Sequence, residues 1–326
     1  MNESRLARRS VVALGGGHGL SATLRALTCI ADDVTGIVGT IDDGGSSGRL
    51  RRQMRIPPPG DLRMALAAMM PEDAEGVQWR AVLQHRFDGE VDIGGHALGN
   101  LVLAALWEET GDIVEGLDIL GQAMRARGRV LPHALVPAEL IAVVSDPKGV
   151  REVRGQAEIS QTRGVIEELR IEPAHPVPCQ QAVAAIVASD VLVFGPGSWF
   201  TSVLPHLLID EVREAVLAST ARRILIVNLS GEAGEAEGYP THGYLASWAR
   251  FFPDIGLDTV LADSAHVDDV GLLSDAAAKV GASVALCDVA RDGVHDPLLL
   301  AGALTEMLMQ DMSINGSNDW QGMRNE

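Results

Sequence analysis

A short acidic and glycine-rich segment, residues 42–52, carries the strongest chemical signal in the chain. It reads Asp-Asp-Gly-Gly-Ser-Ser-Gly-Arg-Leu-Arg-Arg and directly follows the β-branched run Val34–Ile41. Glycines let main-chain N–H groups turn towards a bound oxyanion, and the hydroxyl groups of Ser46 and Ser47 add donors. Arginines supply positive charge in a fork geometry that suits phosphate. The segment therefore predicts a phosphate-binding site.

The two aspartates of this segment need a different partner, because a carboxylate does not favour a bare phosphate. Three roles stay open for Asp42 and Asp43: binding Mg²⁺ together with ligand phosphates, accepting a hydrogen bond from a ribose or sugar hydroxyl group, or taking a proton. We expect that the protein requires no cofactor. A Mg²⁺ ion bound together with a nucleotide-diphosphate ligand stays open. Cysteine and histidine spacings typical of a zinc site do not occur.

A glycine-rich turn near the N-terminus, Gly15–Gly19, is a second candidate anion site. It follows the apolar run Val11–Leu14 and precedes a helix that we expect Ser21 to cap. A strand, a glycine turn and a helix in this order are typical of nucleotide-binding α/β folds. Leu20 stands where a third glycine is usual, whereas Asp42 lies at about the 20-residue spacing of a ribose-binding acid.

Candidate strands, among them Val191–Phe194 and Ser283–Cys287, alternate with candidate helices, the last over Asp296–Met309. This alternation predicts an α/β fold class. We expect a Rossmann-like three-layer structure, with a parallel sheet, helices on both faces and a small β-rich insertion. Ligands of such sheets bind beyond the carboxyl ends of the strands. Two glycine turns and an arginine cluster then favour a nucleotide-diphosphate ligand. The segments that directly follow strands, and should meet at one edge, are Gly15–Gly19, Asp42–Arg52, Gly195–Ser198 and Asn228.

The domain organisation is expected to be simple. Residues 1–10 are predicted to form a flexible leader, residues 11–312 a single Rossmann-like domain, and residues 313–326 a disordered tail. An insertion of about residues 120–178 is indicated by alternating apolar and polar positions between turn residues.

The composition excludes several classes of partner. A net charge of −18 and only two Tyr and five Phe argue against a nucleic-acid surface. No apolar run reaches the ~18 residues of a membrane span, and no apolar stretch follows the arginine-containing leader. Three widely spaced cysteines suit buried thiols in a reducing compartment. We therefore expect a cytoplasmic protein with a small-molecule ligand, and a homo-oligomer stays open.

Two helix N-termini carry further polar side chains. The stiff segment Ile56–Gly60 leads to Asp61, which is expected to cap a helix, with Arg63 in its first turn. His96 and Asn100 are four positions apart at the start of a strongly apolar helix. A structural role and a ligand role stay open for all four side chains.

Five motifs taken together resemble those of one bacterial family. The chain resembles the gluconeogenesis factor family (YvcK-like), within the superfamily of the CofD-like phospho-lactate transferase of deazaflavin biosynthesis, over roughly residues 9–310. The motifs, in chain order, are Gly15-Gly-Gly-His-Gly-Leu-Ser21, Asp42-Asp-Gly-Gly-Ser-Ser-Gly-Arg-Leu-Arg51, Pro57-Pro-Pro-Gly-Asp-Leu-Arg63, Gly95-His-Ala-Leu-Gly-Asn-Leu101 and Gly195-Pro-Gly-Ser-Trp-Phe-Thr-Ser202.

The resemblance implies a Rossmann-like core that binds a UDP-sugar, notably UDP-N-acetylglucosamine. It also implies a cytoplasmic role in cell morphogenesis and peptidoglycan supply during growth on gluconeogenic carbon. The first hypothesis is therefore a ligand-binding regulator without a catalytic residue. The alternative is a Mg²⁺-dependent transferase of a phosphorylated group from a nucleotide-diphosphate donor.

Two other chemistries fit the residues less well. Gly44–Gly48 matches the G-x-S-x-G pattern of serine hydrolases, but a strong helix is not expected directly after Ser46. A dinucleotide oxidoreductase would want the third glycine that Leu20 replaces. The candidate ligand-binding residues are Gly15, Gly16, Gly17, His18, Gly19, Asp42, Asp43, Gly44, Gly45, Ser46, Ser47, Arg49, Arg52, Gly60, Asp61, Arg63, His96, Asn100, Gly195, Pro196, Gly197, Ser198, Thr201 and Asn228, with Asp42 and Asp43 as candidate metal ligands.

Overall fold

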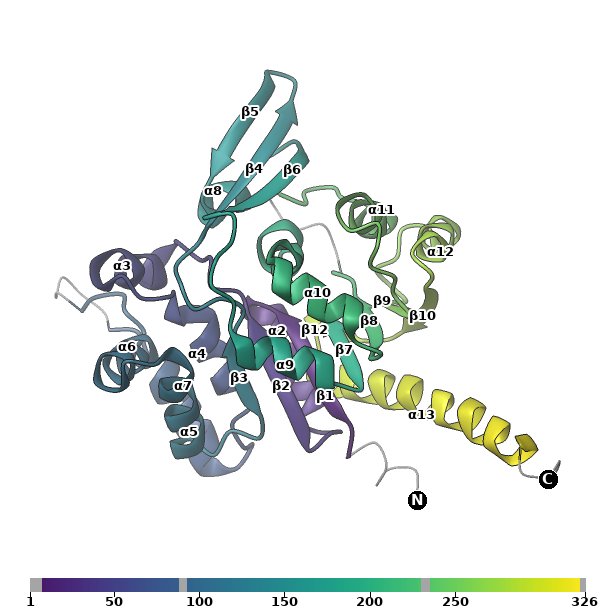
Figure 1. Ribbon diagram of the computed structural model, residues 1–326, viewed down its shortest axis with the longest axis horizontal. Helices are drawn as coiled ribbons and strands as arrows, with labels where there is room; N and C mark the ends of the chain where they lie inside the picture. Colours follow the sequence, from purple (N-terminus) through teal and green to yellow (C-terminus); the bar gives the residue numbers. More distant parts are fainter. Residues whose placement is uncertain (1–7, 88–92, 230–234, 323–326) are drawn as a thin grey trace.

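A parallel seven-stranded sheet forms the centre of the protein (Figure 1). The computed structural model describes residues 8–87, 93–229 and 235–322. The strand order is β10-β9-β8-β7-β1-β2-β3, and neighbouring strands pair in parallel. The strands are β1 (Ser10–Gly15), β2 (Asp33–Val38), β3 (Arg129–Pro132), β7 (Val191–Phe194), β8 (Arg222–Ile226), β9 (Thr259–Asp263) and β10 (Ser283–Cys287).

Strand β1 shows why the central strands are continuously apolar. Val11 and Ala13 belong to one hydrophobic cluster, whereas Val12 and Leu14 belong to the other. Successive side chains of a strand point to opposite faces, so a strand covered on both faces must be apolar at every position. The Rossmann-like three-layer fold with helices on both faces is confirmed.

Helices cover both faces of the sheet, and a separate group of helices lies beyond β3 (Figure 1). One face carries α2 (Gly17–Leu27), α4 (Pro59–Ala68) and α13 (Pro297–Gly322). The other carries α9 (Gln180–Ala188), α10 (Asp210–Ala218), α11 (Thr241–Phe251) and α12 (Val270–Lys279). The group beside β3 comprises α5 (Ala74–Gln84), α6 (Leu98–Thr110) and α7 (Ile113–Ala123).

The β-rich insertion is a three-stranded antiparallel sheet that projects from the body (Figure 1). It is shorter than the predicted range 120–178, because α7 and β3 still belong to the main domain and β3 pairs with β2. One face of the insertion continues the main hydrophobic cluster through Leu140, Ile166 and Ile171. Its elements are β4 (Glu139–Asp146), β5 (Gly149–Arg154), α8 (Gln156–Ser160) and β6 (Val165–Glu172).

Three local predictions are corrected by the structure. Helix α3 (Gly45–Met54) begins inside the glycine-rich segment, where we did not expect a strong helix. It forms because Leu50 is buried on one side and arginines near its C-terminus interact favourably with the helix dipole. Asp61 is not the cap of α4, since Pro58 takes that position. Ser21 does not cap α2 either, and its hydroxyl donates to the carbonyl of Gly17 (2.9 Å).

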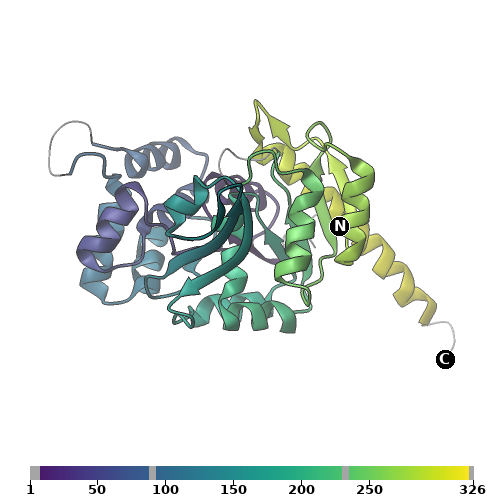
Figure 2. The ribbon, with the colours of Figure 1, turned by 90° about the horizontal axis from the view of Figure 1, so that it is seen from above.

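The C-terminal helix also differs from expectation. The sequence predicts a helix to Met309 and a disordered tail from residue 313, but α13 runs on to Gly322 and extends away from the body (Figure 2). No proline interrupts the segment, so a helix once nucleated can propagate. Residues 1–7 of the predicted leader and residues 323–326 lie outside the described residues.

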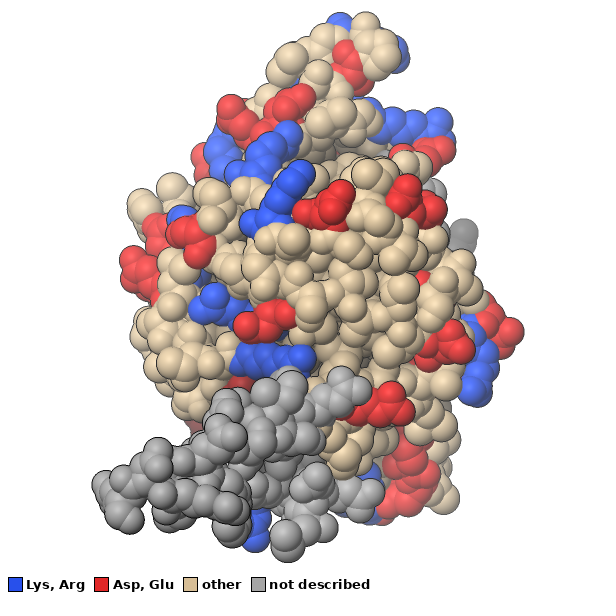
Figure 3. Space-filling view, turned by 90° about the vertical axis from the view of Figure 1, so that its right-hand side faces the viewer, with Lys and Arg blue, Asp and Glu red and all other residues tan. Residues whose placement is uncertain are grey.

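The surface carries charges of both signs. On the face shown in Figure 3, arginine side chains lie among aspartates and glutamates, both on the projecting sheet and on the body below it. Within the part of the chain that the structure describes, no helix is long and apolar enough to cross a bilayer.

The aromatic packing under α11 generates a stability prediction. Trp248 is fully buried, stacks edge-on against Phe194 (5.1 Å between ring centroids) and donates to the carbonyl of Ile255 (2.8 Å). Trp248→Ala should lower the free energy of unfolding by about 3–5 kcal/mol in urea denaturation. Trp79→Ala, at a side chain that is 43% exposed, is the matched control and should cost less than about 1 kcal/mol. Equal losses would contradict the packing described.

Candidate functional site

The carboxyl ends of β1 and β7 define the point where the strand order reverses. From β1 the chain proceeds to β2 and β3 on one side, whereas β8, β9 and β10 follow β7 on the other. Ligands of open α/β sheets bind at such a point. Two hollows flank it: we call them the switch-point pocket, of 220 Å³, and the arginine pocket, of 550 Å³.

The two pockets are defined by the residues that line them. The switch-point pocket is lined by His18, Gly19, Ala22, Pro196, Gly197, Asn228, Leu229, Gly293, Val294 and His295. The arginine pocket is lined by Asp42, Gly44, Gly45, Ser46, Ser47, Arg49, Gly60, Asp61, Arg63, Met64, Arg86 and Gly95.

Close packing between the two glycine turns shapes the switch-point pocket. A Cβ atom at Gly19 would lie 2.2 Å from the carbonyl oxygen of Pro196, so only glycine permits this approach. Asn228 ties the second turn to the end of β8, because its side chain accepts from the N–H of Gly197 (2.8 Å) and donates to the Gly197 carbonyl (2.9 Å). The predicted meeting of these turns at one edge is therefore confirmed.

Two buried histidines support the strand ends beneath the site. The Nε2 atom of His206 donates to the carbonyl of Gly15 (3.0 Å), and the Nε2 atom of His133 accepts from the N–H of Thr40 (3.0 Å). Burial lowers the pKa of both rings, to about 4 for His206, so both are neutral at pH 7. The two histidines hold the backbone at Gly15 and Thr40, where the two candidate ligand-binding loops begin.

Asp61 lies between the two pockets, at the N-terminus of α2. Its carboxylate accepts a hydrogen bond from the backbone N–H of Gly17, and a Cβ atom at Gly16 would lie 2.6 Å from its Oδ2. Burial, and secondly the charge of Asp42, raise the pKa of Asp61 to about 6. The N–H group of Gly17, which we expected to bind a ligand phosphate, is thus bonded to the carboxylate of Asp61.

The arginine pocket combines two helix N-termini with three guanidinium groups. Gly45 and Ser46 form the first turn of α3, and Gly60 lies in the first turn of α4. Backbone N–H groups at helix N-termini favour anions. Arg49 Nη2 donates to the Gly94 carbonyl (2.9 Å), and Arg86 Nη1 donates to the Gly95 carbonyl (2.9 Å). These bonds hold both guanidinium groups at the rim of the pocket.

A buried hydrogen-bond chain forms the floor of the arginine pocket. Arg63 Nε donates to Asn100 Oδ1 (2.8 Å), and Asn100 Nδ2 donates to Ser46 Oγ (3.0 Å). Ser46 Oγ is 2.9 Å from His96 Nδ1, and the tautomer of the imidazole decides which of the two donates. The pKa of His96 is lowered by burial and by the charges of Arg49 and Arg86, which favours the neutral ring.

Arg63 is the most constrained of these groups. It is 2% exposed, and its Nη1 atom is buried without a hydrogen-bond partner among the described residues. Burial lowers the pKa of Arg63 to about 10, with a further contribution from the charge of Arg86. The guanidinium is still charged at pH 7, and its Nη1 group has no acceptor among the described residues.

The adjacent aspartates Asp42 and Asp43 contact different parts of the structure. Asp42 lines the pocket, accepts from the N–H of Gly44 (2.9 Å) and from the hydroxyl of Ser47, and its pKa is raised mainly by burial. Asp43 turns to the insertion, where its Oδ1 accepts from the N–H of Ala157 (2.9 Å) at the start of α8. Arg52 is exposed and donates to the Asp43 carbonyl (3.1 Å).

Of the predicted site residues, 14 line the two pockets. Asp43 contacts the insertion, Arg52 is exposed and Thr201 is buried. The other predicted residues that do not line a pocket are Gly15, Gly16, Gly17, His96, Asn100, Gly195 and Ser198. Among the described residues, no group of three or more His, Cys, Asp and Glu side chains could hold a metal ion. The acidic pair that faces the arginine pocket is Asp42 with Asp61.

Comparisons with known proteins show which family the chain is similar to. A family model described as 2-phospho-L-lactate transferase CofD matches residues 11–295. A gluconeogenesis factor of Mycobacterium tuberculosis (strain ATCC 25618 / H37Rv) is 43% identical over 311 residues, 93% of this chain and 91% of its own length. The gluconeogenesis factor of Bacillus subtilis (strain 168) is 36% identical over 259 residues, 79% of this chain and 80% of its own.

The chain belongs to the gluconeogenesis factor family of CofD-like proteins. A crystal structure of a UPF0052 family member from Bacillus halodurans has the same fold, with a TM-score of 0.82 and 31% identity. That comparison covers 91% of this chain and 98% of the other.

Several residues of this gluconeogenesis factor site were missed in the sequence. Gly293, Val294 and His295 enter the switch-point pocket from the hairpin of β11 (Ala290–Arg291) and β12 (Val294–His295). They follow β10, so the rule that ligands bind beyond strand ends could have found them. Arg86 reaches the arginine pocket from the segment between α5 and α6, and no local pattern marks it.

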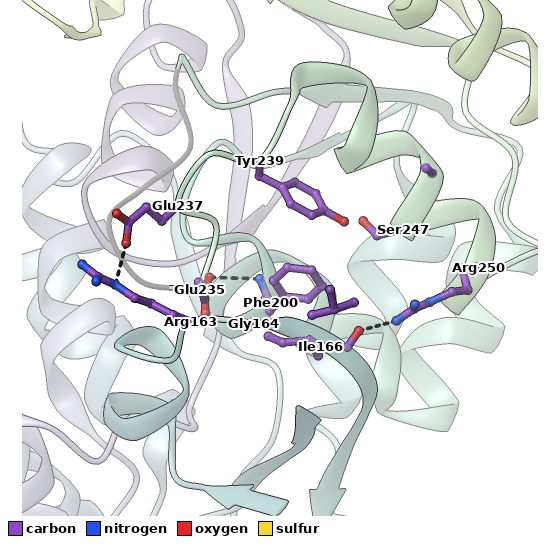
Figure 4. Close-up of a pocket in the computed structure, with 11 residues that line it drawn as sticks. Arg163, Gly164, Ile166, Phe200, Glu235, Glu237, Tyr239, Ser247 and Arg250 are labelled. Atoms are coloured by element: carbon purple, nitrogen blue, oxygen red, sulfur yellow. Dashed lines mark hydrogen bonds and ion pairs between the residues drawn. The ribbon is translucent and has the colours of Figure 1, made fainter. Parts of the chain in front are cut away.

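A cavity larger than either of these pockets lies elsewhere, between β6, α11 and the short helical turn η1 (Trp199–Val203) (Figure 4). Its volume is 620 Å³, with Phe200 and Tyr239 among its lining residues. The arginines at its rim already have partners: Arg163 pairs with Glu237 (2.8 Å), and Arg250 donates to the Ile166 carbonyl. No predicted anion-binding residue lines it, so we place the functional site at the sheet edge.

Asp61 makes folding stability depend on pH. Its folded-state pKa of about 6 exceeds the ordinary aspartate pKa of 3.8, so its stabilising contribution is full below about pH 4 and is lost as the pH rises through 6. Asp61→Asn keeps an acceptor for Gly17 but no charge. It should raise the free energy of unfolding by up to about 3 kcal/mol at pH 7 and change it little at pH 4.

Urea denaturation at both pH values measures this difference. Asp275→Asn, at an exposed position on α12, is the control and should have little effect at either pH. A gain for Asp61→Asn that is equal at pH 4 and pH 7 would show that the Asp61 charge is not destabilising.

Proposed function

We propose that this protein is a nucleotide-sugar-binding regulator, with UDP-N-acetylglucosamine as its ligand, and that the ligand diphosphate is held in the arginine pocket. The observation that supports the proposal best is the buried Nη1 atom of Arg63, which has no hydrogen-bond partner among the described residues. Removing a charge from water costs several kcal/mol unless it is paired. A ligand anion would supply the missing acceptor, and its negative charge would add to that of Asp61, which already interacts with Arg63.

The other groups of the arginine pocket fit a diphosphate in particular. The N-termini of α3 and α4 and the guanidinium groups of Arg49 and Arg86 provide several donors around one space. A ligand with a single carboxylate would not need so many hydrogen-bond donors. Asp42 and Asp61 would accept hydrogen bonds from sugar hydroxyl groups at the edge of the same space.

The biological role proposed here follows the family. Relatives are named for gluconeogenesis, so we place this protein in the cytoplasm of cells growing on gluconeogenic carbon. Ligand occupancy would report the supply of nucleotide sugar for peptidoglycan and cell shape. The geometry accommodates such a sensor, because recognition needs only donors and acceptors, without a nucleophile.

Ligand-induced stabilisation tests this proposal. UDP-N-acetylglucosamine at about a hundred times its dissociation constant should raise the free energy of unfolding by roughly 2.7 kcal/mol. Arg63→Met should abolish the effect, and Arg86→Gln, at an exposed residue, should weaken binding about tenfold or more.

Arg170→Gln, a side chain 48% exposed on β6, serves as the control and should bind like the unchanged protein. Urea denaturation with and without ligand gives the free energies, and titration calorimetry gives the affinities. An unfolding curve that does not move with any UDP-sugar would rule out the proposed function.

A second candidate is transfer of a phosphorylated group from a nucleotide-diphosphate donor. It is favoured by the CofD family model and by Asp61, whose pKa of about 6 suits a general base near neutral pH. Mg²⁺, held by Asp42 and the ligand phosphates, would supply countercharge when bound.

Phosphorus NMR of UDP-N-acetylglucosamine with protein, Mg²⁺ and candidate acceptor alcohols tests turnover. The transferase predicts loss of the diphosphate signals and their persistence with Asp61→Asn. Unchanged spectra over a day would leave the regulator as the better account.

A further inference from the structure

His295 lines the switch-point pocket and has an unused hydrogen-bond acceptor. Its imidazole donates to the backbone carbonyl of Val227, and its Nε2 atom is buried without a partner among the described residues. The donating nitrogen must therefore be Nδ1. Burial lowers the pKa of His295 to about 4, so the ring is neutral at pH 7. A neutral ring protonated at Nδ1 carries its lone pair at Nε2.

The position of His295 is fixed by its surroundings. It lies in strand β12, which pairs with β11 through Ala290, and the hairpin turn contains Gly293 at a positive φ of 76°. Val227 immediately precedes Asn228, which is bonded at both ends of its amide to Gly197. The acceptor is thus held on the same rigid frame as the glycine turns.

We infer that the switch-point pocket recognises an amide or imide N–H group of the ligand through His295 Nε2. This inference rests on the proposed function. It assigns to the switch-point pocket the end of the nucleotide sugar that does not occupy the arginine pocket. The pocket of 220 Å³ is too small for the whole ligand and lies on the other side of Asp61 and the α2 N-terminus. A buried acceptor without a donor is costly, and a ligand N–H would remove that cost.

Two parts of UDP-N-acetylglucosamine carry such a donor. The uracil ring has an imide N–H at N3, and the sugar has an acetamido N–H. Either would give specificity, because a site built to accept a hydrogen bond rejects analogues that lack the donor.

Paired substitutions isolate the acceptor. His295→Asn can still donate to the Val227 carbonyl but has no group at the position of Nε2, whereas His295→Gln restores an acceptor there. His175→Asn, at an exposed residue paired with Asp210, is the matched control. Thermal unfolding of each variant shows whether the fold is kept.

Titration calorimetry of the full chain with UDP-N-acetylglucosamine, UDP-glucose, UDP and N3-methyl-UDP tests the inference. His295→Asn should weaken binding of UDP-N-acetylglucosamine about five- to tenfold, with recovery in His295→Gln. If the donor is uracil, N3-methylation should weaken binding to the unchanged protein but not to His295→Asn. If it is the acetamide, His295→Asn should bind UDP-glucose normally.

Equal affinities of the unchanged protein and a folded His295→Asn for every ligand would overturn the inference and leave the proposed function intact. Failure of the unchanged protein to bind any UDP compound would instead overturn the proposed function.

Discussion

The charge of Arg63, buried at the edge of a parallel sheet, is the constraint on which the site depends. A guanidinium that is 2% exposed must have its donors satisfied. Asn100 takes one of them, and Ser46 and His96 orient Asn100 in turn. This chain explains why three motifs far apart in sequence meet here. The Nη1 group has no acceptor among the described residues, and Arg63 lines a space bordered by two helix N-termini, where an anion is favoured.

Asp61 links the two pockets and sets their electrostatics. Its carboxylate occupies the N-terminus of α2, so that helix is not available to a phosphate while Asp61 remains there. Anion binding is thereby directed to α3 and α4, where positive side chains gather. The switch-point pocket is left with neutral groups, among them Asn228 and His295, and is suited to a neutral part of a ligand.

The sheet could be predicted from sequence because its strands are local apolar runs, and the runs over Val191–Phe194 and Ser283–Cys287 are observed with the same bounds. The meeting of the glycine turns followed from parallel strand direction alone. By contrast, the role of Asp43 as a partner of α8 depends on how an insertion far along the chain docks. The reach of Arg86 and the acceptor of His295 likewise depend on tertiary contacts, which no spacing rule contains.

The central claim is that Arg63 binds the diphosphate of a nucleotide sugar. A crystal structure of the protein with UDP-N-acetylglucosamine tests it most directly. We predict a phosphate oxygen within about 3 Å of Arg63 Nη1, with Arg49 and Arg86 around the same group. A ligand bound with its diphosphate at the α2 glycine turn or in the cavity beside α11, and only water at Arg63, would contradict the account.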